Sequence, residues 1–160
     1  FGDKKDVHVK PNYFTHSGFA LVSINYRLRW DYKIYDQVVE LVNTIRWVQE
    51  HGAEFGLDAN RIVMMGHGAG GHLVSLVMAA SPQTHVSKNP NLPPFALLYN
   101  PERDITTLQA KGFAKALTGA GSELVMFPGS VTDPARTNEL VGVSGNIAMV
   151  ALMAFIPSQI

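Results

Sequence analysis

The chain contains no cysteine, which excludes disulfide bonds, cysteine-bound metals and thiol catalysis. Charged residues are also scarce, at 16% of the 160 residues, where about 25% is usual. The 13 basic and 13 acidic side chains cancel, so nucleic acid is not an expected partner. The longest apolar run, Ile147 to Ile156, has ten residues, whereas a membrane span needs about 20. No secretory signal is visible either, which favours a cytoplasmic location.

Length and composition indicate one folded domain. At about 150 residues per domain, 160 residues correspond to a single unit. Apolar residues make up 46% of the chain, too many for a disordered protein. We therefore expect one domain over residues 1–160, without a separate cap domain. The low charge suggests extensive burial or a surface that meets a partner, including a second copy of the chain.

Expected strands and helices alternate along the sequence, an order that favours a parallel sheet flanked by helices. Apolar segments predict strands at residues 19–25, 61–65, 95–99 and 123–127. These strands are apolar throughout, as expected when both faces of a sheet are covered. Patterning predicts helices at about residues 32–51, 69–80, 106–118 and 146–155. The side chains expected to face the core from the first and third helices are Ile34, Val38, Leu41, Ile45, Val48, Leu108, Phe113 and Leu117.

A glycine-rich bend over residues 66–71 joins the second expected strand to the following helix. It fits the dinucleotide-binding pattern G-x-G-x-x-G through Gly66, Gly68 and Gly71. That pattern requires an acidic residue about 20 positions later to bind the ribose. No acidic residue lies between Asp58 and Glu102, which counts against a nucleotide at this bend.

The same bend also fits a nucleophile elbow, G-x-S-x-G, between Gly66 and Gly70. The central residue of an elbow lies on a strained turn, so small residues are needed two positions before and after it. The backbone N–H groups of Ala69 and Gly70 would face a substrate as oxyanion donors. Their alternative role is simply to begin the helix. The central residue is Gly68 rather than serine, so the elbow carries no nucleophile.

Around this bend the sequence resembles the α/β-hydrolase family, in particular the small carboxylesterases and lipases of the hormone-sensitive-lipase-like kind. The similar stretches are Phe19–Leu28, Ile45-Arg46-Trp47-Val48, Asn60-Arg61-Ile62, Ala69-Gly70-Gly71-His72-Leu73, Pro93–Tyr99 and Phe127-Pro128-Gly129. The resemblance implies a truncated α/β-hydrolase-like three-layer sandwich with a predominantly parallel sheet. It also implies hydrolysis of a small acyl ester without a cofactor.

In this family a serine nucleophile, an acid and a histidine base follow one another along the chain. The resemblance places Gly68 where the nucleophile would be and Ala69 as an oxyanion donor. It places Glu102 where the acid would be, with Asp104 as a near alternative. A solvated loop carboxylate is the other interpretation of Glu102.

The base of the triad is missing as well. The resemblance places it after Phe127, but the last of the six histidines is His85. Thr132 or Asp133 lies roughly where the histidine would be. With two of three triad members absent, we expect an esterase-like fold with negligible ester hydrolysis. The alternative is a non-catalytic binding or interaction module, a pseudoenzyme on the same fold.

Two further features bear on ligands and on the sheet. His67 and His72 resemble a metal pair, but no second cluster supplies a third ligand, so we expect no metal. The segment 81–94 is short for a family whose members hold another strand there, and the family's oxyanion loop lies before a helix that residues 2–14 resemble. The sheet therefore closes up, a partner fills the gap, or the sequence is part of a longer protein.

Overall fold

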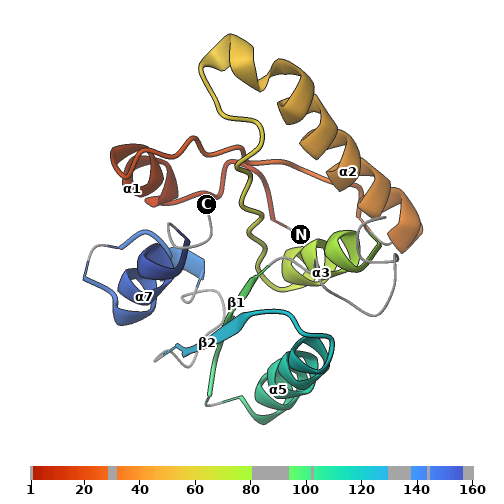
Figure 1. Ribbon diagram of the computed structural model, residues 1–160, viewed down its shortest axis with the longest axis vertical. Coiled ribbons are helices and arrows are strands. Elements are labelled where there is room, and N and C mark those ends of the chain that lie inside the picture. Colours follow the sequence, from red (N-terminus) through yellow and green to blue (C-terminus); the bar gives the residue numbers. More distant parts are fainter. Residues whose placement is uncertain are drawn as a thin grey trace.

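The computed structural model describes residues 2–28, 32–80, 94–101, 103–129, 138–143 and 145–156. Their elements are α1 (Lys10–His16), α2 (Ile34–His51), the 3-10 helix η1 (Gly52–Phe55), α3 (Ala69–Ala80), β1 (Phe95–Tyr99), α5 (Asp104–Gly119), β2 (Leu124–Pro128) and α7 (Ile147–Phe155) (Figure 1). All four expected helices are confirmed, as are the last two expected strands. Within the described ranges, no helix combines the length and the apolarity needed to cross a membrane.

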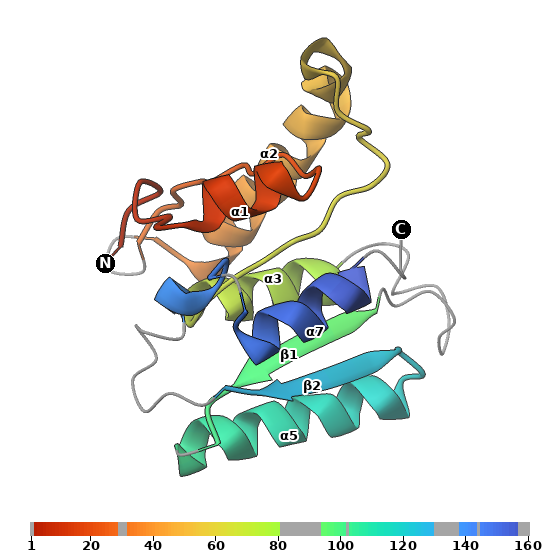
Figure 2. The same cartoon turned by 90° about the vertical axis from the view of Figure 1, so that its left-hand side faces the viewer.

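A parallel pair of strands, β1 and β2, lies in the second half of the chain. Phe95 pairs with Leu124 at one end of the ladder, and Tyr99 pairs with Pro128 at the other. Parallel strands need a crossover connection, and α5 supplies it. Figure 2 shows α5 along one face of this pair, with α7 and α3 on the opposite side. The expected parallel, helix-flanked arrangement is therefore present, in the form of a two-stranded sheet.

The expected strands at residues 19–25 and 61–65 are wrong. Both segments lack ladder pairing, and several of their apolar side chains are exposed, including Val22 and Val63. A strand exists only where a neighbouring backbone accepts and donates its hydrogen bonds, and neither segment has such a neighbour among the residues that the structure describes. Side chains hold residues 19–25 instead: Ser23 Oγ donates to the Lys4 carbonyl at 2.8 Å, and Asn25 Oδ1 accepts from the Lys4 N–H at 2.6 Å.

The principal core forms where α2 packs against α3. Leu41 from α2 meets Leu73 and Val77 from α3, and all three are buried. Ile24 and Met64 from the two unpaired segments pack against this cluster. Burial of these side chains, rather than strand pairing, therefore holds the unpaired segments beside the helices.

The helix α5 contributes a second buried face against the strands. Leu117 is buried, and Phe113 packs edge-on against Phe95 with ring centroids 5.9 Å apart. The expected core position of Leu108 is wrong, because this side chain is 70% exposed. Leu108 lies five residues before Phe113, which is about 1.4 helical turns and points it away from the buried face. Ile34, at the start of α2, is likewise 47% exposed.

Candidate functional site

The bend between residues 65 and 69 is held by a close approach of its own backbone. A Cβ placed on Gly66 would overlap the carbonyl of Gly70 and the backbone nitrogen of Gly71. A Cβ on Gly71 would lie 3.1 Å from the Gly66 oxygen, whereas one on Gly70 would meet only the Tyr26 hydroxyl at 4.0 Å. The position that requires glycine is therefore 66, whereas a side chain at 71 would be tight. The expectation of a tight position at Gly70 is wrong, because its Cβ direction is open.

Gly68 stands at the centre of the bend with a left-handed backbone. Its φ is +55°, and a Cβ built on it would have no neighbour within 4 Å. The Gly70 N–H donates to the His67 carbonyl at 2.9 Å, and the His72 N–H donates to the Gly68 carbonyl at 3.2 Å. The position thus combines a backbone that L-residues adopt at a cost with free space for a side chain.

The two expected oxyanion donors, the N–H groups of Ala69 and Gly70, differ in whether they already donate a hydrogen bond within the protein. The Gly70 N–H is already donated to His67, so it is not available to a ligand. The Ala69 N–H begins α3 and has no acceptor in the part of the chain that the structure describes. Backbone N–H groups at a helix start carry partial positive charge. Of the two expected donors, the Ala69 N–H therefore remains, and it follows Gly68 directly.

The remaining expected site residues are not brought together by the described structure. Glu102 lies outside the described residues, as do Thr132 and Asp133. Asp104 begins α5 and is exposed. The neighbouring Asn100 is buried, and its carbonyl accepts from the Thr107 hydroxyl at 2.8 Å.

The histidines of the bend are both exposed, His67 before Gly68 and His72 in the first turn of α3. Among the described residues no group of three or more metal-binding side chains forms around them.

The bend and the carboxyl ends of β1 and β2 lie on the same side of the molecule (Figure 2). In parallel α/β sheets, ligands bind at this end of the strands.

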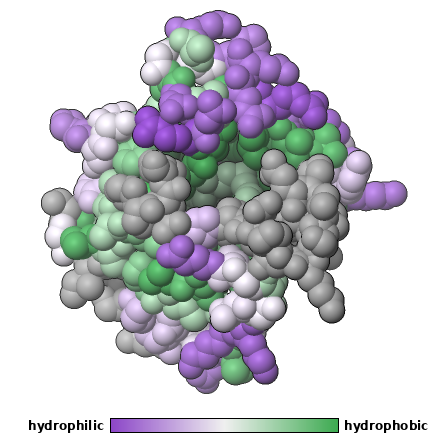
Figure 3. Space-filling model, viewed as in Figure 1, coloured by the Kyte–Doolittle hydropathy of each residue, from purple (hydrophilic) through white to green (hydrophobic). Residues whose placement is uncertain are grey.

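A large cleft contains the bend. It opens between the amino-terminal part of the chain, with α1 and α2, and the later part, with β1, β2 and α7. Its volume is about 2400 Å³, well above the roughly 300–1,000 Å³ of an ordinary ligand pocket. The unpaired segments 19–25 and 61–65 line it, as does β1 over Phe95–Leu98. Figure 3 shows hydrophobic residues around the hollow below the polar surface of α2. The two unpaired segments thus face this cleft.

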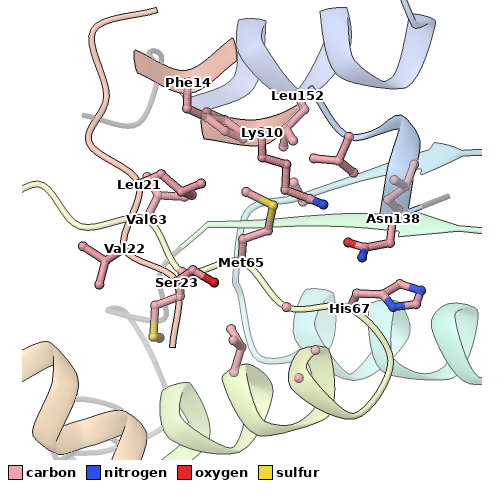
Figure 4. Close-up of a pocket in the computed structure, with 18 of the residues that line it drawn as sticks. Lys10, Phe14, Leu21, Val22, Ser23, Val63, Met65, His67, Asn138 and Leu152 are labelled. Atoms are coloured by element: carbon pink, nitrogen blue, oxygen red, sulfur yellow. The ribbon is translucent and has the colours of Figure 1, made fainter. Parts of the chain in front are cut away.

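The cationic side chains of Lys4, Lys10 and Arg61 line this cleft. Lys10 is the buried one of the three, and sequence reasoning missed it. Lys10, the first residue of α1, is only 7% exposed, and Figure 4 shows its ammonium group pointing toward the space between Met65 and Asn138. Burial lowers the pKa of the Lys10 ammonium, and the charge of Glu139 offsets part of that shift. Lysine is almost never buried, and no local pattern around Lys10 signals it.

Comparison with known proteins adds a family and several relatives. Residues 2–95, more than half of the chain, match the BD-FAE family model. The chain is 36% identical over 56 residues to an arylesterase of Saccharolobus solfataricus, a match that covers 35% of this chain and 18% of the relative. It is 33% identical over 76 residues to a probable carboxylic ester hydrolase, LipM, of Mycobacterium tuberculosis, covering 47% and 18%.

A third relative is Lipase 2 of a Moraxella species, 34% identical over 61 residues, which are 38% of this chain and 14% of the lipase. The matches therefore span less than a fifth of each of these relatives. No solved structure matches the chain.

Proposed function

Because the chain belongs to the BD-FAE family, we propose that it is a carboxylic-ester hydrolase domain of the α/β-hydrolase kind whose own hydrolytic centre is inactive. The observation that carries the proposal is the backbone of Gly68, left-handed and with open space where a side chain would project. A nucleophile elbow has these properties at its central residue. Glycine at this point offers no atom that can attack a carbonyl carbon.

Besides a nucleophile, acyl transfer needs an oxyanion donor, an acid and a base. The chain has candidates for the first two and none for the base. The Ala69 N–H, which has no acceptor among the described residues, lies next to Gly68, where a donor would stabilise the negative charge that develops on a carbonyl oxygen. We assign Glu102 the place of the acid that orients the base. A base would follow β2, but no histidine occurs after His85. A serine hydroxyl without a base is a poor nucleophile at neutral pH.

The proposal includes a truncated form of the family's fold, a three-layer sandwich in a single domain over residues 1–160. Helices on both sides of the β1–β2 pair support it, as does the position of the bend on the side of the strands' carboxyl ends. The ester hydrolase and lipase names of the relatives support a small acyl ester as the ligand class.

The chain should hydrolyse p-nitrophenyl butyrate no faster than buffer. Gly68→Ser should stay at the same rate, because the added hydroxyl has no base to accept its proton. Release of p-nitrophenolate, followed by absorbance, measures both rates, with Ser17→Ala as a matched substitution away from the bend. The proposal of an inactive centre would be contradicted by turnover well above buffer that Gly68→Ser or Glu102→Gln changes. Such a result would show that these residues take part in catalysis.

A second candidate function, a non-catalytic binding module, is favoured by the size and the apolar walls of the cleft. Such a module would bind an apolar acyl group or a second copy of the chain without chemistry. Ethyl butyrate should then raise the thermal unfolding temperature, since a ligand of the folded state stabilises it by mass action. A monomer by light scattering, with no thermal shift up to the solubility of the ester, would count against this alternative.

A further inference from the structure

The cleft holds a buried positive charge that no group of the described protein neutralises directly. Lys10 is 7% exposed, and its ammonium makes no hydrogen bond or ion pair within the described ranges. A charge removed from water without a partner is costly, and such groups normally occur paired. The lowered pKa of Lys10 has this burial as its main cause. The side chain is therefore held in an unfavourable environment that an anion would relieve.

The packing of α1 keeps this side chain where it is. A Cβ on Gly142 would lie 3.2 Å from the Cα of Lys10 and 3.3 Å from the Cβ of Tyr13, so the 138–143 segment lies tightly against the start of α1. Gly142 also has a φ of +94°, a conformation that favours glycine. The backbone of Lys10 is thus packed against a segment that is fitted to it, which fixes the point from which the side chain enters the cleft.

Several apolar side chains and the amide of Asn138 line the cleft near the ammonium. Figure 4 shows Phe14, Leu21, Met65 and Leu152 around the same space, with the Asn138 amide on its far side. An amide can donate a hydrogen bond to an anion. A buried cation and an amide beside these apolar side chains match a ligand with one carboxylate and an aliphatic chain.

Glu139 is the competing partner. Its charge acts on Lys10, but it forms no ion pair with it in the described structure, and its side chain is exposed to water. Glu139 is therefore solvated and leaves the ammonium to a ligand that reaches it through the cleft.

We propose that Lys10 and Asn138 form a binding site for an aliphatic carboxylate, with the chain of the ligand lying along the apolar wall of the cleft. The site concerns binding alone, so it holds whether or not the bend at Gly68 is catalytic. It differs from the acyl-group binding proposed above because it requires the negative charge of the ligand.

Octanoate and octanamide test this requirement on the 160-residue chain by isothermal titration calorimetry. Octanoate should bind at least about tenfold more tightly than the uncharged amide, since a hydrogen bond to a charged group carries that much affinity. Lys10→Met should remove the difference, whereas Lys5→Met, at an exposed lysine outside the cleft, should keep it. Equal binding of the two probes to the unmodified chain would overturn the site while leaving apolar binding intact.

Glu139→Gln provides a second test that does not depend on how Lys10→Met folds. Removing the competing carboxylate should raise the affinity for octanoate and leave that for octanamide unchanged. A fall in octanoate affinity, or no change, would overturn the geometry, because Lys10 would then not be the group that meets the carboxylate.

Discussion

Replacing Gly66 with alanine should lower the free energy of unfolding by about 3 kcal/mol, the upper end of the usual cost of overpacking. The added methyl group would overlap backbone atoms of Gly70 and Gly71, which cannot rotate away as a side chain can. Relieving the overlap requires the first turn of α3 to move, and that turn leads directly into Leu73 and the principal core. Urea denaturation followed by circular dichroism measures the change.

Two glycine-to-alanine controls separate this overlap from the general effect of a methyl group. Gly68→Ala should cost about 1–2 kcal/mol, because the position is open but its φ is positive. Gly112→Ala lies within α5, in open space, and should stabilise the protein by about 0.5–1 kcal/mol. If Gly66→Ala cost no more than Gly68→Ala, the backbone of the bend would not approach itself as described.

Leu73→Ala should lower the free energy of unfolding by about 2–5 kcal/mol. Leu73 is 2% exposed and has the largest of the fully buried side chains that the structure describes. Its loss would leave a cavity between α2 and α3, and neither helix can collapse into it freely because Leu41 and Val77 occupy the flanks. The midpoint of urea denaturation should fall, with little change in the slope of the transition.

Leu108→Ala is the matched control, since it makes the same change on another helix at a side chain that is 70% exposed. It should alter the free energy of unfolding by less than about 0.5 kcal/mol. Equal losses from the two substitutions would show that α3 does not form the centre of the core.

Local patterns predicted the helices well because their hydrogen bonds are made within the segment itself. The spacing of Val38, Leu41 and Ile45 fixed the buried side of α2, and Gly52 marked its end. The predicted core position of Leu108 was wrong because Leu108 and Phe113 are five residues apart and do not share a face of the helix. The sequence also predicted β1 and β2. Only one helix, α5, separates them in the chain, so each strand finds its pairing partner nearby.

The strands expected at residues 19–25 and 61–65 could not be judged from their own residues. β-propensity describes side chains that fit a half-buried sheet surface, and both segments have such side chains. Whether a segment pairs depends on what lies beside it in space, and here it faces a cleft. A strained turn at the centre of the bend was expected from its glycines, and Gly68 there has a φ of +55°. The burial of Lys10 was not expected, because no local pattern around it indicates the residues, such as Gly142, that pack against it.

The β1–α5–β2 unit is contiguous in sequence, from Phe95 to Pro128. Bringing its two strands together closes a short loop, and the entropy lost grows with loop length. During synthesis on the ribosome, the amino-terminal half emerges before any of the described strands can pair. Because transiently exposed apolar segments promote aggregation, we expect the exposed apolar side chains of residues 19–25 and 61–65 to make the newly synthesised chain prone to aggregate.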